Sequence, residues 1–268
     1  MTVTTVYSST TDGYVDSYST VSYAVAKAGT GSFAVDNSGT LALIGQYYDG
    51  VSKYECIHDY VSFDTSSIND ADTVTIATLS IWAIYGAPPT AHTLRARTYD
   101  WGNTLTSGDW QTPSQAAANT LLATFASAST VAGAYCVFTS EAALLTATGM
   151  KTGTVYMIVV SSRFESETTP TGGSEYNVYS SSDESGTTQD PKLVITHSLS
   201  FTGTAAPSFP FLDAAASGTV TITSASGTIA ATFPFMTASA SGTRVNPLGP
   251  VQITGGALLR PNPRLILE

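Results

Sequence analysis

The chain is poor in charged residues, and this limits its partners. Lys, Arg, Asp and Glu make up 11% of the 268 residues, whereas they are about 25% of an ordinary globular protein. Only 10 residues are Lys or Arg, and the formal net charge is −10. Because phosphate binding needs clustered basic side chains, the sequence predicts no nucleic-acid partner. Anionic membrane surfaces are disfavoured for the same reason.

Long apolar runs are also absent. No segment approaches the roughly 18 consecutive apolar residues of a membrane helix, so we expect no membrane insertion. The first residues, MTVTTVYSSTTDG, contain neither a basic nor an apolar stretch, so we expect no secretory signal. A surface rich in Ser, Thr, Gly and Ala nevertheless looks extracellular. A phage virion component, assembled in the host cytoplasm and released by lysis, fits both observations; an extracellular protein without its leader is the alternative.

The chain contains only two cysteines, Cys56 and Cys136. Both fall in segments of strand-like apolar pattern. A disulfide between them would close a long loop and contribute about 4 kcal/mol on the chain-entropy model. Folding in a reducing cytoplasm favours two buried free thiols instead.

Alternating apolar and polar residues, separated by Gly, Asn, Asp and Pro turns, predict many short strands. The predicted strands are residues 13–18, 21–26, 41–47, 54–63, 73–85, 93–101, 121–125, 134–138, 154–161, 175–180 and 192–196. One helix is predicted over residues 140–149, with Ser140 as its N-cap and Gly149 in the left-handed position after its end. Residues 1–198 therefore predict an all-β fold, a jelly-roll-type β-sandwich with one short helix.

The composition changes at residues 199–203, and the chain then repeats itself. GTAAPSFPFLDAAASGT begins at Gly203 and GTIAATFPFMTASASGT at Gly227, which gives a 24-residue period. Each unit has one Phe-Pro-Phe group, too little apolar surface for a core of its own. Residues 199–268 thus predict a β-rich repeat and assembly region that packs on itself, on the sandwich or on other copies. The final segment, PVQITGGALLRPNPRLILE, can add a strand to a neighbour.

Four segments carry a family resemblance: YECIHDYVSFDTSSI (54–68), DTVTIATLSIWAIYG (72–86), RARTYDWGNTLTSGDW (95–110) and NVYSSSDESGTTQDPKLVITH (177–197). In order and spacing they resemble the DNRLRE family of β-sandwich modules, which look like carbohydrate-binding domains. The resemblance covers about residues 11–198, and its apolar framework positions imply a fold rather than an activity. The 24-residue repeats resemble those of phage tail and fibre proteins.

Signals for catalysis are weak. The histidines His58, His92 and His197 are isolated and match no metal-binding spacing, and no G-x-S-x-G elbow is present. A glycosidase needs two carboxyl groups about 5–9.5 Å apart. The candidate acids, which we interpret as solvated loop residues, are Asp100, Asp109, Glu165 and Glu167. We expect a protein that is not an enzyme and needs no cofactor.

A calcium site is the main metal hypothesis, because jelly-roll carbohydrate modules often carry a structural Ca²⁺. Asp12, Asp16, Asp183 and Glu184 lie in turn-like segments and offer the oxygen ligands that this ion prefers. The alternative is that these acids only form turns.

Sugar binding is the main functional hypothesis for the sandwich. Sugars stack their C–H faces on exposed aromatic rings, and Tyr47, Tyr48, Tyr99 and Trp110 are predicted at strand ends or in loops. Trp82 is interpreted as a core residue and Trp101 as a family framework position. Trp110, in the loop SGDWQTP, is the predicted exposed ring.

These patterns favour a non-enzymatic structural protein of a phage particle, from the tail, the fibre or the head surface as a decoration. Its expected partners are other virion proteins, copies of itself and a host-surface glycan or receptor. The alternative is a carbohydrate-binding module of a secreted bacterial protein, and a hydrolase is the third hypothesis.

Overall fold

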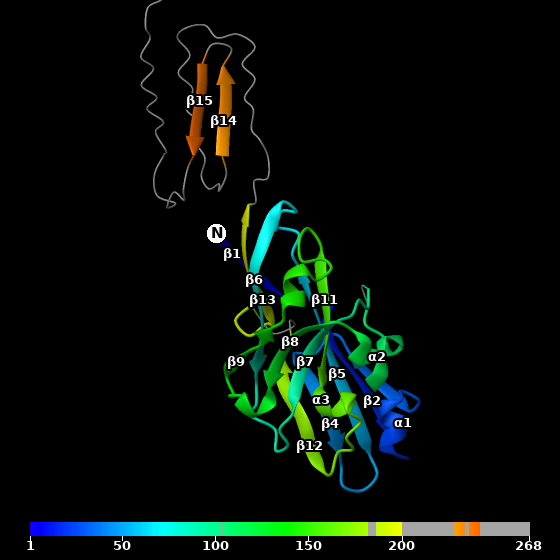
Figure 1. Ribbon diagram of the computed structural model, residues 1–268. Helices are drawn as coiled ribbons and strands as arrows, with labels where there is room; N and C mark the ends of the chain where they lie inside the picture. Colours follow the sequence, from blue (N-terminus) through cyan, green and yellow to red (C-terminus); the bar gives the residue numbers. More distant parts are fainter. Residues whose placement is uncertain (103, 182–185, 200–227, 234–235, 242–268) are drawn as a thin grey trace, which may run out of the picture. The chain divides into compact units, whose positions relative to one another are not determined.

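The computed structural model describes residues 1–102, 104–181, 186–199, 228–233 and 236–241. The chain divides into two compact units, Met1–Ser198 and Leu199–Glu268, and each is described by itself (Figure 1).

The first unit is an antiparallel β-sandwich, as the sequence predicts. Its strands are β1 (Thr2–Tyr7), β2 (Gly13–Ser19), β3 (Ser32–Asp36), β4 (Leu41–Tyr48), β5 (Tyr54–Asp64), β6 (Asp72–Ala83), β7 (Thr93–Thr98), β8 (Leu121–Ala126), β9 (Ala134–Val137), β10 (Thr139–Ser140), β11 (Thr154–Ser161), β12 (Gly173–Ser180) and β13 (Lys192–Leu199). The helices are α1 (Tyr23–Lys27), α2 (Pro113–Ala118) and α3 (Ser162–Glu165), with 3-10 turns η1 (Ser107–Asp109), η2 (Ser127–Ser129) and η3 (Ala142–Thr146).

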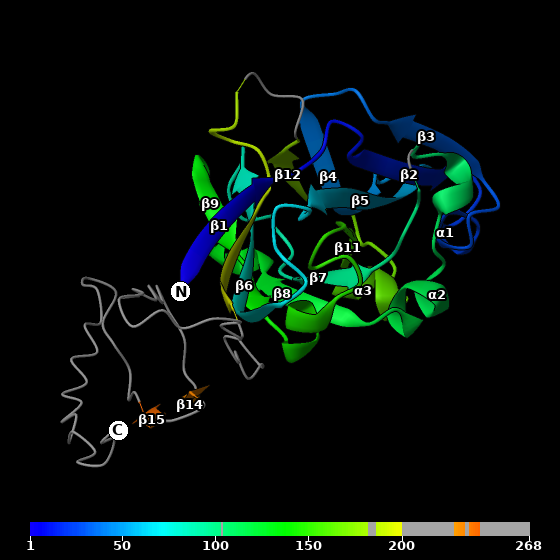
Figure 2. The ribbon, with the colours of Figure 1, turned by 90° about the horizontal axis from the view of Figure 1, so that it is seen from above.

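Strand β5 joins the two layers of the sandwich. The strand order is β1-β13-β6-β12-β4-β5-β11-β7-β8-β10, with β2 paired between β3 and β5 and with β9 paired to β6. The first half of β5, residues 54–57, pairs with β4, whereas its second half, residues 59–64, pairs with β11. The sheet therefore splits along β5, and Figure 2 shows β11, β7 and β8 below β12, β4 and β5.

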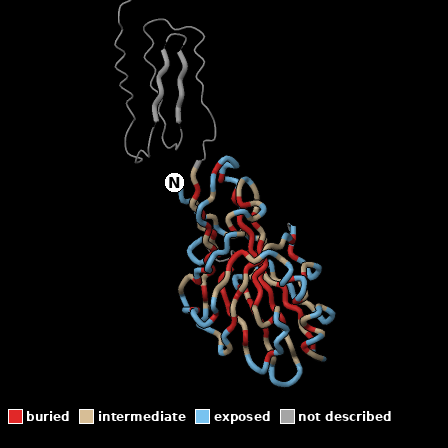
Figure 3. The backbone as a smooth tube through the Cα atoms, in the orientation of Figure 1, coloured by how far each residue is buried: buried red, intermediate tan, exposed pale blue. Residues whose placement is uncertain are grey.

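Two apolar cores fill the unit, and Figure 3 shows the buried backbone running through its interior. The first core lies between the two layers and includes Ile44, Phe63, Leu79 and Met157. The second packs the opposite face of β5 and β11 against α1, α2, α3 and the segment that carries Trp101 and Trp110. Full burial of each large apolar side chain contributes about 1.5–3 kcal/mol.

The predicted helix over residues 140–149 is wrong. Ser140 belongs to β10, where its backbone pairs with Ala123 and its hydroxyl donates to the Ala77 carbonyl at 2.5 Å. It therefore cannot cap a helix, and only the 3-10 turn η3 follows. Gly149 does adopt the predicted left-handed conformation, with φ +80°.

The single predicted helix is replaced by three short α-helices, and one of them overturns a predicted strand. Residues 21–26 alternate like a strand, yet Tyr23–Lys27 form α1. The Ser22 hydroxyl caps this helix by accepting from the Val25 N–H at 3.3 Å, and the neighbouring alanines favour helix. Tyr23 and Ala26, three residues apart, bury one helix face.

The cysteines do not pair. Cys56 and Cys136 are free and buried, and they belong to different cores. No helix of the described part of the chain is long and apolar enough to cross a membrane.

In the second unit the structure describes one antiparallel hairpin, β14 (Thr228–Phe233) paired with β15 (Met236–Ser241). Both strands belong to the second predicted repeat. The first repeat, the break at residues 200–203 and the final segment from Pro250 lie outside the described residues.

Candidate binding face on the sandwich

The four predicted sugar-binding rings do not form one site. Trp110 is buried, with 7% of its surface exposed. Its ring stacks on His58 with centroids 4.1 Å apart, and Phe33 and Phe164 contact it edge-on. Its Nε1 donates to the Lys27 carbonyl at 3.4 Å. The prediction of an exposed Trp110 is wrong, because chain segments far away in sequence cover the loop.

Tyr99 and Tyr48 are also engaged elsewhere. Tyr99 packs against the second core and its hydroxyl donates to Asp109 Oδ1 at 3.4 Å. Tyr48 stacks on Tyr54, with ring centroids 4.3 Å apart and 12° between their planes. Because successive residues of a strand point to opposite faces, Tyr48 and Tyr47 lie on opposite sides of β4. Trp101 is buried as expected, whereas Trp82 is half-buried.

Tyr47 instead shares a sheet face with three tyrosines that the sequence analysis missed. One row of cross-strand pairs crosses the sheet. Asp16 of β2 pairs with Ile57 of β5, and Ile57 pairs on its other side with Gly45 of β4. Gly45 pairs in turn with Tyr176 of β12. The adjacent row is Tyr18, Glu55 and Tyr47. Since cross-strand partners point to one side, we call this surface the tyrosine face; its residues are Tyr14, Asp16, Tyr18, Gly45, Tyr47, Glu55, Ile57 and Tyr176.

The tyrosine face has a buried floor and partly exposed rings. Asp16 and Ile57 are buried, whereas all four tyrosines are intermediate in exposure. Gly45 has φ +143°, and a Cβ there would lie 2.6 Å from the Tyr176 Cα. Only glycine therefore fits, and it leaves the floor without a side chain between Ile57 and Tyr176. The Tyr47 and Tyr176 rings meet edge-on, 6.3 Å apart.

Carboxylates give this face a negative charge. Burial, reinforced by the nearby Glu55 carboxylate, raises the pKa of Asp16 from 3.8 to about 7, although the Lys53 ammonium opposes the shift. Glu55 forms an ion pair with Lys53, whose Nζ lies 4.7 Å from the centre of the Tyr18 ring. Burial and then the Asp36, Asp16 and Glu55 carboxylates raise the pKa of Tyr14.

Of the four predicted calcium ligands the structure describes Asp12 and Asp16, and Asp16 lies within strand β2 rather than in the predicted turn. Asp183 and Glu184 lie outside the described residues. Asp12 is buried, and its Oδ1 accepts from the Ser62 N–H and hydroxyl, both at 2.9 Å. Burial and the neighbouring Asp59 raise its pKa. Among the described residues no three His, Cys, Asp or Glu side chains gather as a metal site, so calcium binding stays a prediction.

The acids considered for hydrolysis have structural partners. The Glu165 carboxylate pairs with Arg95 and with Arg97, whose Nε lies 2.5 Å from Oε1. Asp109 caps η1 by accepting from the Thr106 N–H at 2.8 Å. Glu167 pairs with Lys27, and Asp100 accepts from the Gly102 N–H at 2.8 Å. All four carboxylates thus have partners within the fold. The prediction of a solvated loop acid is wrong for Glu165, which belongs to α3 and whose side chain is 3% exposed.

The contacts of His197 resemble those of a catalytic triad. His197 Nδ1 lies 2.5 Å from Asp72 Oδ2, and its Nε2 lies 2.9 Å from the Thr4 hydroxyl. This order of hydrogen bonds matches a hydrolase triad with threonine as the nucleophile. The three residues come from β6, β13 and β1, so the contacts also tie these strands together.

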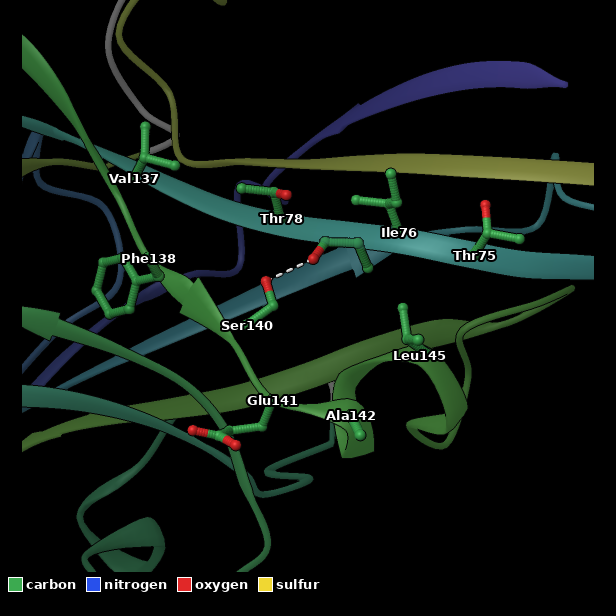
Figure 4. A pocket seen from close by; sticks show the side chains of 10 residues that line it. Thr75, Ile76, Thr78, Val137, Phe138, Ser140, Glu141, Ala142 and Leu145 are labelled. Carbon is green, nitrogen blue, oxygen red and sulfur yellow. Dashed lines mark hydrogen bonds between the residues drawn. The ribbon is translucent and has the colours of Figure 1, made fainter.

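A shallow cavity of about 400 Å³ lies on β6, β9 and η3 (Figure 4). It is lined by apolar and hydroxyl side chains, including the exposed Ile76 and Val137, with Glu141 as the charged group. None of Thr4, Asp72 and His197 lines it. The triad-like contacts therefore do not face this cavity, and we interpret them as a link between strands.

Comparisons with known proteins add no assignment: no protein-family model matches the chain, and no curated protein matches its sequence.

Proposed function

We propose that the protein is a non-enzymatic attachment protein that binds a glycan through the tyrosine face. The observation that supports this is the gathering of Tyr14, Tyr18, Tyr47 and Tyr176 from three strands around a buried floor. Aromatic rings that are half-exposed offer flat apolar surfaces for the C–H faces of a sugar, while their hydroxyls can bind water or ligand. Asp16 and Glu55 add acceptors that orient sugar hydroxyls.

Affinity at one such face would be modest. An open sheet surface buries little of a ligand, and little binding energy remains after the loss of ligand freedom. Attachment would gain strength from many copies, since linked weak sites raise overall avidity by factors of 10²–10⁴. This favours a structural component of a phage particle, in the tail, the fibre or the head surface, with residues 199–268 holding the copies together.

A carbohydrate-binding module of a secreted bacterial protein is the second candidate. The resemblance of residues 11–198 to such modules supports it. Antibodies raised against the purified protein should label phage particles in the first case and the culture medium or cell surface in the second.

The binding test compares matched tyrosine variants. A multivalent sample of the full chain is screened on a glycan array, and single-site affinity for the best glycan is then measured by calorimetry. We expect Tyr47→Ala and Tyr176→Ala each to weaken binding about tenfold, because each removes one stacking ring worth about 1–1.5 kcal/mol. The control is Tyr7→Ala, an exposed tyrosine of β1.

Retained affinity in both face variants, or an equal loss in Tyr7→Ala, would place the binding site elsewhere. If the array and binding to host cells are both negative for the multivalent sample, attachment through a glycan is the wrong function.

A further inference from the structure

The floor of the tyrosine face carries one carboxylate oxygen, Asp16 Oδ1, that lacks a hydrogen-bond donor among the described residues. Asp16 is buried, with 8% of its surface exposed, and among the described residues none donates a hydrogen bond to its Oδ1. Its cross-strand neighbours, Ala34 and Ile57, offer no side-chain donor. A buried carboxylate oxygen without a hydrogen bond is costly, so this position is suited to a donor that arrives with a ligand.

The nearby cation is already used. Lys53 pairs with Glu55 and lies over the Tyr18 ring. The pair neutralises Glu55, whereas Asp16 forms no ion pair with any described residue. Asp36, which pairs with Tyr14 in the register of β2 and β3, adds a further carboxylate at the edge. The electrostatic potential that a ligand meets on this face is therefore negative.

From these observations, and resting on the proposed function, we infer that the tyrosine face selects amino sugars, with the ligand's ammonium group bound between Asp16 and the tyrosine rings. An ammonium donates three hydrogen bonds and supplies the positively charged partner that Asp16 lacks. It is also attracted to the faces of aromatic rings. Hydrogen bonds between charged groups are about twice as strong as neutral ones.

The same charges discriminate against acidic glycans. A uronate or sialic-acid carboxylate on this face would meet Asp16 and, at the edge, Asp36 on a chain whose net charge is −10. Like charges in a partly buried site repel, and such repulsion is a common source of specificity. Neutral sugars fall between, since they can stack and donate hydroxyls without ionic attraction.

The test uses three tetrasaccharides of similar size with the full-length protein: glucosamine, N-acetylglucosamine and uronate oligomers. Calorimetry at low and high salt should show the glucosamine oligomer binding about tenfold tighter than its acetylated form. Added salt should reduce that difference, because screening weakens ionic attraction. Asp16→Asn, which keeps the shape and removes the charge, should bring the two affinities within about twofold.

The outcomes separate this inference from the proposed function. Equal binding of the amino and acetylated oligomers by the unmodified protein overturns amino-sugar selection but leaves glycan attachment standing, as does preference for the uronate. Binding of none of these oligomers, together with a negative glycan array, overturns both. If Asp16→Asn does not fold, the salt series on the unmodified protein decides: a preference for the glucosamine oligomer that high salt leaves unchanged refutes ionic recognition by Asp16.

Discussion

Replacing Trp110 with alanine should destabilise the sandwich strongly. Its ring fills the second core between His58, Phe33 and Phe164, which come from β5, β3 and α3. Gly29 fits closely against it, since a Cβ at that position would lie 2.3 Å from the Trp110 Cδ1. The ring is therefore enclosed by several chain segments, and none of them can collapse fully into the space that it leaves.

The expected loss can be worked out from this packing. Truncating a buried tryptophan to alanine costs about 3–5 kcal/mol, because both transfer energy and cavity energy are lost. For a unit of this size each kcal/mol lowers the melting temperature by about 2–4 °C. Trp110→Ala should therefore melt about 10 °C lower than the unmodified protein, and its urea midpoint should fall accordingly.

Thermal and urea unfolding followed by circular dichroism provide the assay. The matched control is Tyr85→Ala, which removes an aromatic ring that is 64% exposed and should change stability by less than about 0.5 kcal/mol. A loss below about 1 kcal/mol for Trp110→Ala, or one as small as that of the control, would refute the buried placement of this ring.

Two further predictions concern buried charge. Glu165→Ala should lower the free energy of unfolding in urea by about 3–5 kcal/mol, because it leaves the buried Arg97 without its ion-pair partner. The control Lys27→Ala breaks an exposed ion pair and should cost under about 1 kcal/mol. Similar losses in the two variants would contradict this prediction. Stability should also fall between pH 6.5 and 8: burial raises the pKa of Asp59 from 3.8 to about 8, so the folded state retains a proton there that the unfolded state has released. Burial lowers the pKa of His58 from 6.5 to about 3, so its contribution rises with pH only up to 6.5 and does not offset the fall above it. The Asp59 contribution to the decline should be about 2 kcal/mol. Burial also raises the pKa values of Asp16 and Asp12, so Asp59→Asn should reduce the slope without abolishing it; an unchanged slope in this variant would contradict the assignment.

The strands could be predicted because their signal is local. The alternation of apolar residues predicted residues 154–161 as a strand, and β11 spans Thr154–Ser161. The helices could not be predicted in this way, because residues 21–26 satisfy a strand pattern and a helix pattern at once. The cap at Ser22 and the burial of Tyr23 decide between them, and that burial depends on the rest of the fold.

The binding face needed the register of distant strands. Tyr47 and Tyr176 come together only because β4 pairs with β12, and nothing in the local sequence fixes that pairing. One signal was present: in GYVDSYS, Tyr14, Asp16 and Tyr18 alternate and so must share one face of a strand. The prediction for Trp110 failed for a related reason: its polar loop sequence predicted an exposed ring, whereas contacts with distant segments bury it.

Two residues of the tyrosine face break the rules that stabilise strands. A glycine in the middle of a strand weakens it, and a buried carboxylate oxygen without a donor is costly. Gly45 and Asp16 nevertheless occupy the same cross-strand row. The close approach of Tyr176 accounts for Gly45. No contact within the described residues accounts in the same way for the free oxygen of Asp16. Departures from local consistency are typical of functional sites, and the proposed binding of a ligand between the tyrosine rings of this face would supply the missing donor.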